Sequence, residues 1–359
     1  MVKKSLKVAL ITFTIIIGYV VLGILVPAGM FKTIEPHFAG NITRLELSVA
    51  GPEDITIDQE TGLAFISVDD RRANRHNPGS VQGAILILNL KDSLPAIRNV
   101  TPASLTDFHP HGISLWKDTD KRTFLFAVNH SQNNKEHFVE RFEWRNDSLM
   151  HLESIKDVEL MTSPNDVTAV GERSFYVTND HGYSEKGLGR TLEEYLQRAI
   201  SYVNYFDGNS FKKAASNIAY ANGINHSADY AKIFVASPTG GKVFIYNRDL
   251  ITGALNLSEE VMVNTGVDNI ELDESGALWI GCHPQLLKFV AHAADPANFS
   301  PSQVIKLTQD SLGKYQTEEV FLNDGTSYSG STVAAVYKKK LLIGSVFEKT
   351  MLVCTPSKK

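Results

Sequence analysis

One apolar strand motif recurs six times along the chain, and this repeat constrains the fold more than any other feature. The copies are GLAFIS (62–67), TFLFAVN (123–129), SFYVTND (174–180), KIFVASP (232–238), ALWIGCH (277–283) and KLLIGSV (340–346). They lie roughly 45–65 residues apart, close to the length of a four-stranded propeller blade. Further strand-like runs follow, such as AILILNL, HFVERFEW, KVFIYN and LLKFVA. We therefore predict an all-β, six-bladed β-propeller; a pair of β-sandwiches is the alternative, but sandwiches do not need this period.

An uncharged run at the N-terminus departs from this pattern. It extends from Val8 to Phe31 and follows three lysines. A membrane-spanning helix needs about 20 apolar residues, whereas the apolar core of a cleaved signal peptide has roughly 7–15. We therefore predict a transmembrane signal anchor over residues 1–31, with the lysines in the cytoplasm and a propeller domain over residues 35–357 on the extracytoplasmic side. The alternative is a removed signal peptide, which would also export the remainder.

The segment GRTLEEYLQRAISYVNYF (189–206) breaks the strand rhythm. Its apolar residues recur at helical spacing, and Thr191 with Glu194 forms a capping-box pattern. This predicts a helix inserted after the third repeat, which would lie over one face of the propeller as a lid or a membrane-facing element. Ordinary packing of the helix on the top of a blade fits the pattern equally well.

Oxygen-bearing residues precede the repeat strands at a nearly constant offset. In SPNDVTAV, Asn165 lies about eleven residues before the middle of its repeat strand, and His111 holds a similar place, slightly further ahead of TFLFAVN. The residues selected by this offset are Glu53, Asp54, Asn165, Asp166, Asn222, Asp268 and Asn269. Because the first strand of each blade lines the central channel of a propeller, these side chains should converge at one end of that channel.

This set of side chains suits Ca²⁺, which takes six to eight hard oxygen ligands, and not zinc, which prefers His and Cys. Its carboxylates would repel one another and raise their pKa values unless cations neutralised them. Adjacent residues of a strand point to opposite sides, so each adjacent pair can serve one upper and one deeper ion. Turn motifs explain any one pair, and a purely structural calcium plug would use the same set.

These segments also resemble the paraoxonase/arylesterase family, calcium-dependent lactonases with a six-bladed propeller. The similar segments are GPEDITID, FHPHGISLW, VNHS, SPNDVTAVG, FYVTNDH, AYANGINHS, VDNIELDESGALWIGCHP and GSTVAAVYKKKLLIGSVF. They occur in order from about Glu35 to Cys354, at similar spacing. The resemblance implies hydrolysis of lactones and aryl esters, with two Ca²⁺ ions bound.

The same resemblance implies a role for particular residues. The catalytic calcium would be held by Glu53, Asn165, Asn222, Asp268 and Asn269. The structural calcium would be held by Asp54, Asp166 and the backbone carbonyl of Ile113. The histidine dyad that activates water would be His111 and His130. The residues that line the substrate pocket would include Asp180, His181 and His283.

The cysteines depart from the family pattern. Family members usually join their first and last strands by a disulfide, and Cys354 matches its C-terminal member, but FAGNITRLELSVAG contains no partner. Cys282 matches a free, buried cysteine of the family. We therefore predict that the ring closes by strand pairing alone, with TRLELSV completing the last blade.

These residues predict a hydrolytic mechanism. The catalytic calcium would polarise the carbonyl of a lactone or ester, and neutral amide ligands would leave it electrophilic. His111 would take a proton from the attacking water while His130 orients it, since the pKa of histidine lies near 6.5. Two alternatives are a binding propeller that calcium only stiffens and a strictosidine-synthase-like propeller with other chemistry. The net charge of −5, without a basic stripe, argues against a nucleic-acid partner.

Overall fold

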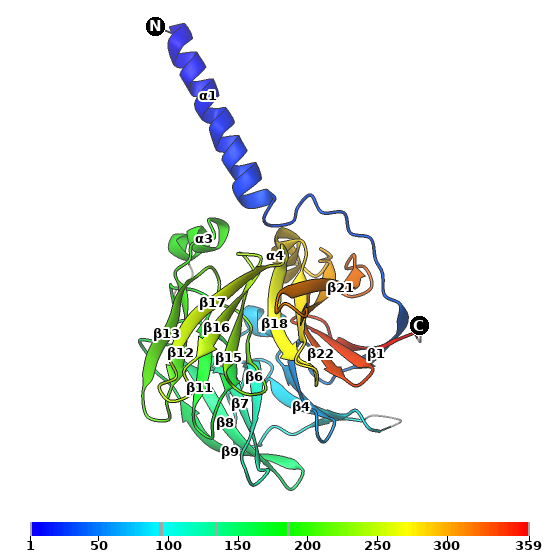
Figure 1. The fold of residues 1–359 in the computed structure, drawn as a ribbon. Coiled ribbons are helices and arrows are strands. Elements are labelled where there is room, and N and C mark those ends of the chain that lie inside the picture. Colours follow the sequence, from blue (N-terminus) through cyan, green and yellow to red (C-terminus); the bar gives the residue numbers. More distant parts are fainter. Residues whose placement is uncertain (1, 93–95, 134, 185–186, 358–359) are drawn as a thin grey trace.

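Six antiparallel four-stranded sheets form the body of the computed structural model, which describes residues 2–92, 96–133, 135–184 and 187–357. Figure 1 shows these sheets gathered into one β-rich body from which the N-terminal helix projects. The blades are β2–β5 (Pro52–Asp58, Leu63–Val68, Ala84–Asn89, Ile97–Asn99), β6–β9 (Pro110–Lys117, Thr123–His130, His137–Arg145, Ser148–Ile155), β10–β13 (Pro164–Ala169, Phe175–Asn179, Ser201–Phe206, Phe211–Ile218), β14–β17 (Ile224–His226, Lys232–Ser237, Lys242–Arg248, Leu255–Met262), β18–β21 (Gly266–Leu272, Leu278–His283, Ser302–Gln309, Tyr315–Asn323) and β22–β24 with β1 (Ser331–Tyr337, Lys340–Ser345, Thr350–Pro356, Gly40–Glu46). The predicted six-bladed propeller is confirmed.

Each copy of the repeat motif forms the second strand of its blade, and the strand before it is the innermost. The innermost strand β2 is buried along its whole length, whereas the outermost strand β17 is mostly exposed. Apolar side chains fill the space between neighbouring blades: Phe126 of β7, for example, packs on Phe175 of β11 with ring centroids 5.8 Å apart. The inner strands are therefore covered on both faces, and the outermost strands meet water.

The ring is closed by pairing between the two ends of the propeller. Strand β1 pairs antiparallel with β24 as the outermost strand of the last blade, so that Ile42 lies opposite Cys354. This confirms that the segment around TRLELSV completes the last blade. Both Cys282 and Cys354 are free and buried.

Ile42→Cys is expected to form a disulfide with Cys354 under oxidising conditions. Directly opposed residues of antiparallel strands have Cα atoms about 4.5–5.5 Å apart, which is within the range of a disulfide. The bond should raise the free energy of unfolding by about 2–4 kcal/mol, measured as a higher Tm without reductant than with it. Thr43→Cys is the matched control because it lies opposite Val353. Equal melting of both oxidised variants would contradict this expectation.

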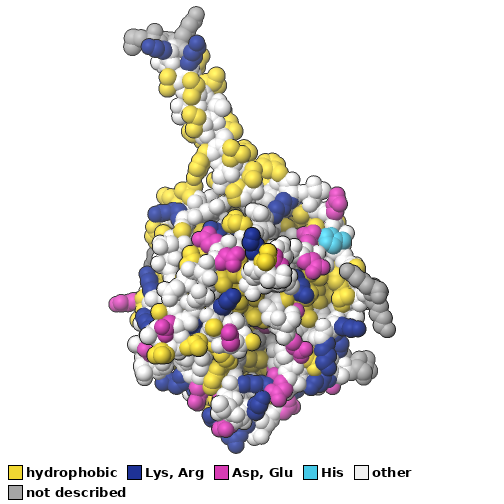
Figure 2. Space-filling view, viewed as in Figure 1, with side chains coloured by type: hydrophobic (Ala, Val, Ile, Leu, Met, Phe, Trp, Pro, Cys, Tyr) yellow, Lys and Arg dark blue, Asp and Glu magenta, His cyan; other side chains and the backbone are white. Residues whose placement is uncertain are grey.

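The N-terminal segment is helical and exposed. Helix α1 (Val2–Val20) continues into a π-helical turn, η1 (Val21–Leu25), and by length and composition Lys4–Leu25 is suited to cross a membrane. Figure 2 shows apolar side chains along this projecting helix, with basic side chains towards its free end. The predicted apolar helix is therefore present.

Two predictions of secondary structure need correction. Helix α3 spans only Leu188–Tyr195, and residues 201–206, predicted to be helical, form strand β12 between β11 and β13. Pairing on both edges outweighs helical periodicity here, because SYVNYF is rich in aromatic and β-branched residues. The predicted capping box is also wrong: Thr191 donates its hydroxyl hydrogen to the carbonyl of Gly187.

The second correction concerns LLKFVA, predicted to be a strand, which lies in helix α4 (Leu286–Ala294). A short helix, α2 (Arg71–His76), follows β3, and the carboxylate of Asp70 caps its N-terminus by accepting a hydrogen bond from the Ala73 amide. In Figure 1, α3 and α4 lie at the end of the propeller from which α1 projects. That end also contains the predicted functional residues.

Candidate functional site

The five side chains predicted to hold the catalytic calcium come from four blades and are all nearly inaccessible to water. Their exposed fractions range from 1% for Asn269 to 6% for Asn222. Four of the five carry a buried oxygen that accepts no hydrogen bond: Glu53 Oε2, Asn165 Oδ1, Asn222 Oδ1 and Asn269 Oδ1. An unsatisfied buried polar atom costs about 1–3 kcal/mol, so a cluster of such oxygens calls for a ligand.

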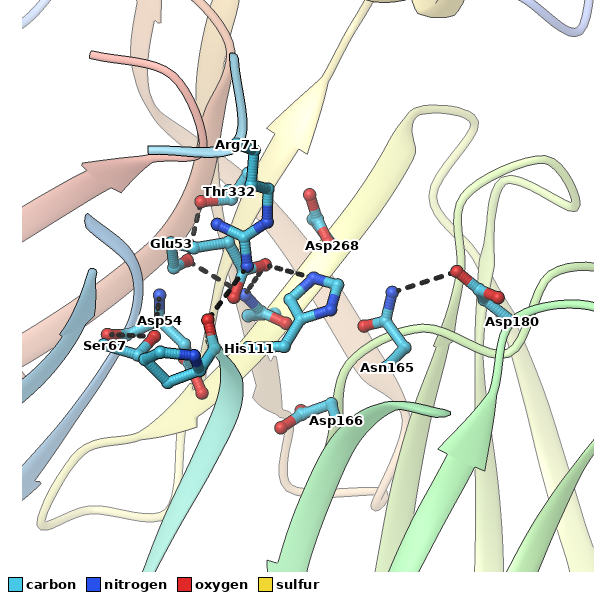
Figure 3. Close-up of polar contacts among 12 residues, drawn as sticks. Glu53, Asp54, Ser67, Arg71, His111, Asn165, Asp166, Asp180, Asp268 and Thr332 are labelled. Carbon is cyan, nitrogen blue, oxygen red and sulfur yellow. Dashed lines mark hydrogen bonds and ion pairs between the residues drawn. The ribbon is translucent and has the colours of Figure 1, made fainter. Parts of the chain in front are cut away.

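The chemistry of this donor set fits a hard cation. Glu53 accepts a hydrogen bond from Asn269 Nδ2 at 2.9 Å through Oε1, which leaves its other oxygen without a partner. In the described part of the chain, no three His, Cys, Asp or Glu side chains are grouped to hold a metal by themselves. The amide oxygens are therefore essential to the set, and oxygen ligands of this kind are those that Ca²⁺ prefers. Figure 3 shows Glu53, Asn165 and Asp268 around the ring of His111.

The deeper pair, Asp54 and Asp166, is built in the same way in alternate blades. One oxygen of Asp54 accepts the Ile113 amide hydrogen at 2.7 Å, and one oxygen of Asp166 accepts the Ile224 amide hydrogen at 2.7 Å. Each carboxylate thus joins its own blade to the next one. Burial and the neighbouring carboxylates raise the pKa of both groups well above the usual range. A cation between blades would relieve this repulsion.

Gly112 permits the close approach of these blades. A Cβ atom at this position would lie 2.0 Å from Asp166 Oδ1 and 2.5 Å from its Cα atom. Any side chain here would push β6 away from β10. The glycine in FHPHGISLW is therefore needed for the predicted channel to close around its polar residues.

The structure brings the two histidines of the predicted dyad together. His111 Nδ1 lies 2.9 Å from His130 Nε2, and His111 Nε2 lies 3.4 Å from Glu53 Oε1. Burial opposes ionisation of Glu53, but His111, Arg71 and the hydrogen bond from Asn269 lower its pKa to about 2. Burial lowers the pKa of His130 well below its usual range, so this ring is neutral at pH 7.

The predicted pocket residues form two further histidine–carboxylate pairs. His181 lies 2.6 Å from Asp180 and 2.8 Å from Glu194 of α3, and these contacts outweigh burial and raise its pKa to about 9. Asp180 also accepts a hydrogen bond from Asn165 Nδ2 at 3.3 Å. The pairs thus connect α3 to the predicted calcium ligands.

The second pair lies beneath α4. His283 Nε2 lies 2.8 Å from Asp268 Oδ2, and the imidazole stacks on the ring of Phe289 at 3.7 Å between centroids. Of the three predicted pocket residues, His283 lines the cavity described below, whereas Asp180 and His181 do not line it and His181 instead contacts Glu194, which does. Burial raises the pKa of Asp268, although His283 opposes this shift.

A pocket of about 510 Å³ lies above these residues. Its floor includes Asn222, Asp268 and His283, and its walls come from α3, α4 and the N-terminal segment at Ile24 and Ala28. This volume lies within the range of small-molecule sites. The end of the N-terminal helix is thus a wall of the same pocket that contains predicted calcium ligands.

Backbone carbonyls of the N-terminal segment accept hydrogen bonds from the residues that begin α4. The Leu286 amide donates to the Ala28 carbonyl at 3.0 Å, and Gln285 Nε2 donates to the Lys32 carbonyl at 2.9 Å. Gly29, with a φ of +73°, passes so close to the Pro284 carbonyl that a Cβ atom would lie 1.9 Å from its oxygen. Residues 28–32 therefore pack closely against the propeller.

Two residues that the sequence reasoning missed lie beside the site. Arg71 of α2 donates to the Pro110 carbonyl at 3.2 Å, and its charge lowers the pKa of Glu53. His137, the first residue of β8, lies opposite His130 across the β7–β8 hairpin, with 2.9 Å between their Nδ1 atoms. The sequence signal for His137 was a pair of histidines on either side of one hairpin loop. That signal becomes informative only once the strand register is known.

The chain is similar to known proteins over most of its length. The Arylesterase family model matches residues 31–355. The chain is 36% identical over 307 residues to human serum paraoxonase/arylesterase 2, covering 84% of this chain and 85% of that one. It is 34% identical over 327 residues to human serum paraoxonase/arylesterase 1, covering 89% and 90%.

Solved structures with lower identity show the same fold. A luciferin-regenerating enzyme matches with a TM-score of 0.53 and 16% identity, covering 88% of this chain and 95% of that one. A gluconolactonase from Xanthomonas campestris matches with a TM-score of 0.52 and 12% identity, covering 91% and 99%. The sequence matches over most of both chains are decisive: this protein belongs to the paraoxonase/arylesterase family.

Proposed function

We propose that the protein is a calcium-dependent hydrolase of lactones and aryl esters. The observation that carries this proposal is the cluster of unpartnered buried oxygens, on Glu53 and three asparagines, beside the imidazole of His111. Membership of the family supports ester hydrolysis, since its relatives are named as paraoxonases and arylesterases. Glu53, Asn165, Asn222, Asp268 and Asn269 would hold the catalytic ion, and Asp54, Asp166 and the Ile113 carbonyl a second one.

The catalytic ion, when bound, would supply an electrophile for the substrate carbonyl. The protein's own contribution begins at His111, whose Nε2 faces Glu53 and the ligand cluster. We propose that this nitrogen takes a proton from the attacking water and later gives it to the oxygen of the leaving group. His130 holds the ring from behind through Nδ1 of His111. The buried ligand cluster excludes bulk water and fixes these groups before substrate arrives.

The pocket and the N-terminal helix support two finer assignments. Tyr195, Leu286 and Phe289 line the pocket, so it suits a small substrate with an apolar body and one ester group. Helix α1 and η1 would anchor the protein in a membrane, with the propeller on the extracytoplasmic side. Basic residues at the N-terminal end of the helix support this orientation.

A hydrolysis panel tests the proposed function. The full chain in detergent micelles would be assayed against lactones, aryl esters and phosphotriesters, with and without a calcium chelator. We expect turnover of lactones and aryl esters that the chelator removes and that added Ca²⁺, but not Mg²⁺, restores, because the oxygen set is large and irregular. A chain that is folded and binds calcium but hydrolyses none of these substrates would refute the proposal and favour a binding propeller.

A further inference from the structure

Three imidazole rings, not two, lie in a continuous row from the ligand cluster. His111 Nδ1 is 2.9 Å from His130 Nε2, and His130 Nδ1 is 2.9 Å from His137 Nδ1. The rings of His130 and His137 meet edge to face, with an interplanar angle of 87° and 4.9 Å between centroids. Both nitrogens of His130 are therefore occupied by other histidines.

The fold determines this row. His130 is the last residue of β7 and His137 is the first residue of β8, and the two are paired in the register of the hairpin. Their side chains consequently lie on the same face of the blade at the site end of the propeller. The pairing of β7 with β8 thus keeps the backbone of His137 beside that of His130.

A row of neutral imidazoles can be hydrogen-bonded in only two directions, because each ring carries one proton. In one direction, His111 Nδ1 donates to His130 and His130 Nδ1 donates to His137, which leaves a lone pair on His111 Nε2. In the other direction, every proton is reversed and His111 Nε2 carries a hydrogen towards Glu53. Only the first direction provides a base at the ligand cluster. The carboxylate of Glu53, 3.4 Å from His111 Nε2, favours the second direction when no cation holds it, so the first direction needs an acceptor at the far end of the row.

We propose that His137 is a positioning residue for the hydrolytic reaction: it accepts the Nδ1 hydrogen of His130 and thereby keeps Nε2 of His111 free to take a proton. This inference rests on the proposed function and deepens it from a dyad to a triad of histidines. His137 transfers no proton to substrate. Its effect passes through the tautomers of His130 and His111.

The surroundings of the row agree with neutral rings. Burial lowers the pKa of both His130 and His137, and the neighbouring imidazoles add to this shift. The charges that face His137 are the carboxylate of Asp180, which favours a proton on this ring, and the guanidinium of Arg190, which opposes one. The groups that face His130 besides its two partners are Arg71 and His109, and both disfavour its charged form.

Two variants of His137 separate positioning from packing. His137→Asn places an amide oxygen near the position of Nδ1, so it can still accept from His130, whereas His137→Phe keeps the ring volume and removes the acceptor. We expect His137→Phe to lower kcat for a lactone roughly 100-fold, with KM and bound calcium unchanged, because a wrong tautomer removes a large part of general-base catalysis. His137→Asn should stay within about threefold of the native kcat.

The ¹⁵N spectrum of histidine-labelled protein reports the tautomer of His130, which would not change if His137 only filled space. The native protein and His137→Asn should show His130 protonated at Nδ1, and His137→Phe should show a loss of that tautomer. Native kcat in His137→Phe, or equal losses in both variants, would overturn the proposal. If the native protein hydrolyses no ester or lactone, the proposed function fails, and an Nε2-protonated His130 in its spectrum would separately refute the assigned direction.

Discussion

Glu53→Gln should lower the affinity for calcium by more than about 100-fold, beyond the losses usual for residues that only support metal ligands. The reason is geometric as well as electrostatic. One oxygen of Glu53 accepts the hydrogen bond from Asn269, and the other is buried without a partner. A glutamine has one oxygen, which Asn269 would retain, so an NH₂ group would replace the free oxygen and present hydrogens to the cation. Calorimetric titration with Ca²⁺ measures the loss directly.

Turnover of Glu53→Gln should fall in parallel and recover partly at high calcium concentration. Glu140→Gln is the matched control, because Glu140 is also 2% exposed but lies in β8 and bonds to Asn129, His151 and Ser154. It removes a buried charge without touching the ligand cluster. Native calcium affinity in Glu53→Gln would contradict the assignment of Glu53 as a ligand.

His111→Gln should have a different signature, with a large loss of kcat and no loss of calcium. Glutamine fills the space of the imidazole and places an amide near Nε2, but an amide cannot take a proton from water at neutral pH. The expected loss is about 10²- to 10⁴-fold, the usual contribution of a general base. Single-turnover hydrolysis of a lactone at saturating calcium isolates the chemical step.

The control for this variant is His151→Gln. His151 lies in β9, the outermost strand of the blade that also contains the dyad, and pairs with Glu140, so its loss should leave hydrolysis within about twofold. Undiminished hydrolysis by His111→Gln would remove His111 from the mechanism, whatever the state of the metal site. Loss of calcium in that variant would instead show that His111 acts by holding Glu53 in place.

The fold was predictable because its strongest signal is periodic. Six similar apolar strands are expected to lie in six similar surroundings, and each copy of the repeat motif does form the second strand of a blade. The site followed from one geometric rule, since the strand before each motif lines the channel; the rule selected Asn165, Asn222 and Asn269, whose oxygens are buried and unpartnered. A propeller can be predicted from sequence because the same local pattern recurs in every blade.

Features that depend on long-range contacts were not predictable. The segment 201–206 has helical spacing, but it pairs with β11 on one side and with β13 on the other, so it forms a strand. The role of His137 depends on the register of one hairpin. The position of Ile24 and Ala28 in the lining of the pocket depends on contacts with residues far away in sequence, so the apolar run alone could not predict it.

Because the end of the N-terminal helix forms part of the pocket wall, proteolytic release of the propeller would affect the pocket. If helix α1 anchors the protein in a membrane as proposed, a peptidase that cut after Ala28 would release the propeller. The same cut would remove the carbonyl that accepts from the Leu286 amide and would open one side of the cavity. A cut before Ile24 would release the propeller with this wall of the pocket intact. Soluble and membrane-held forms of this protein would then differ in catalysis according to which peptide bond is hydrolysed, and not only in location.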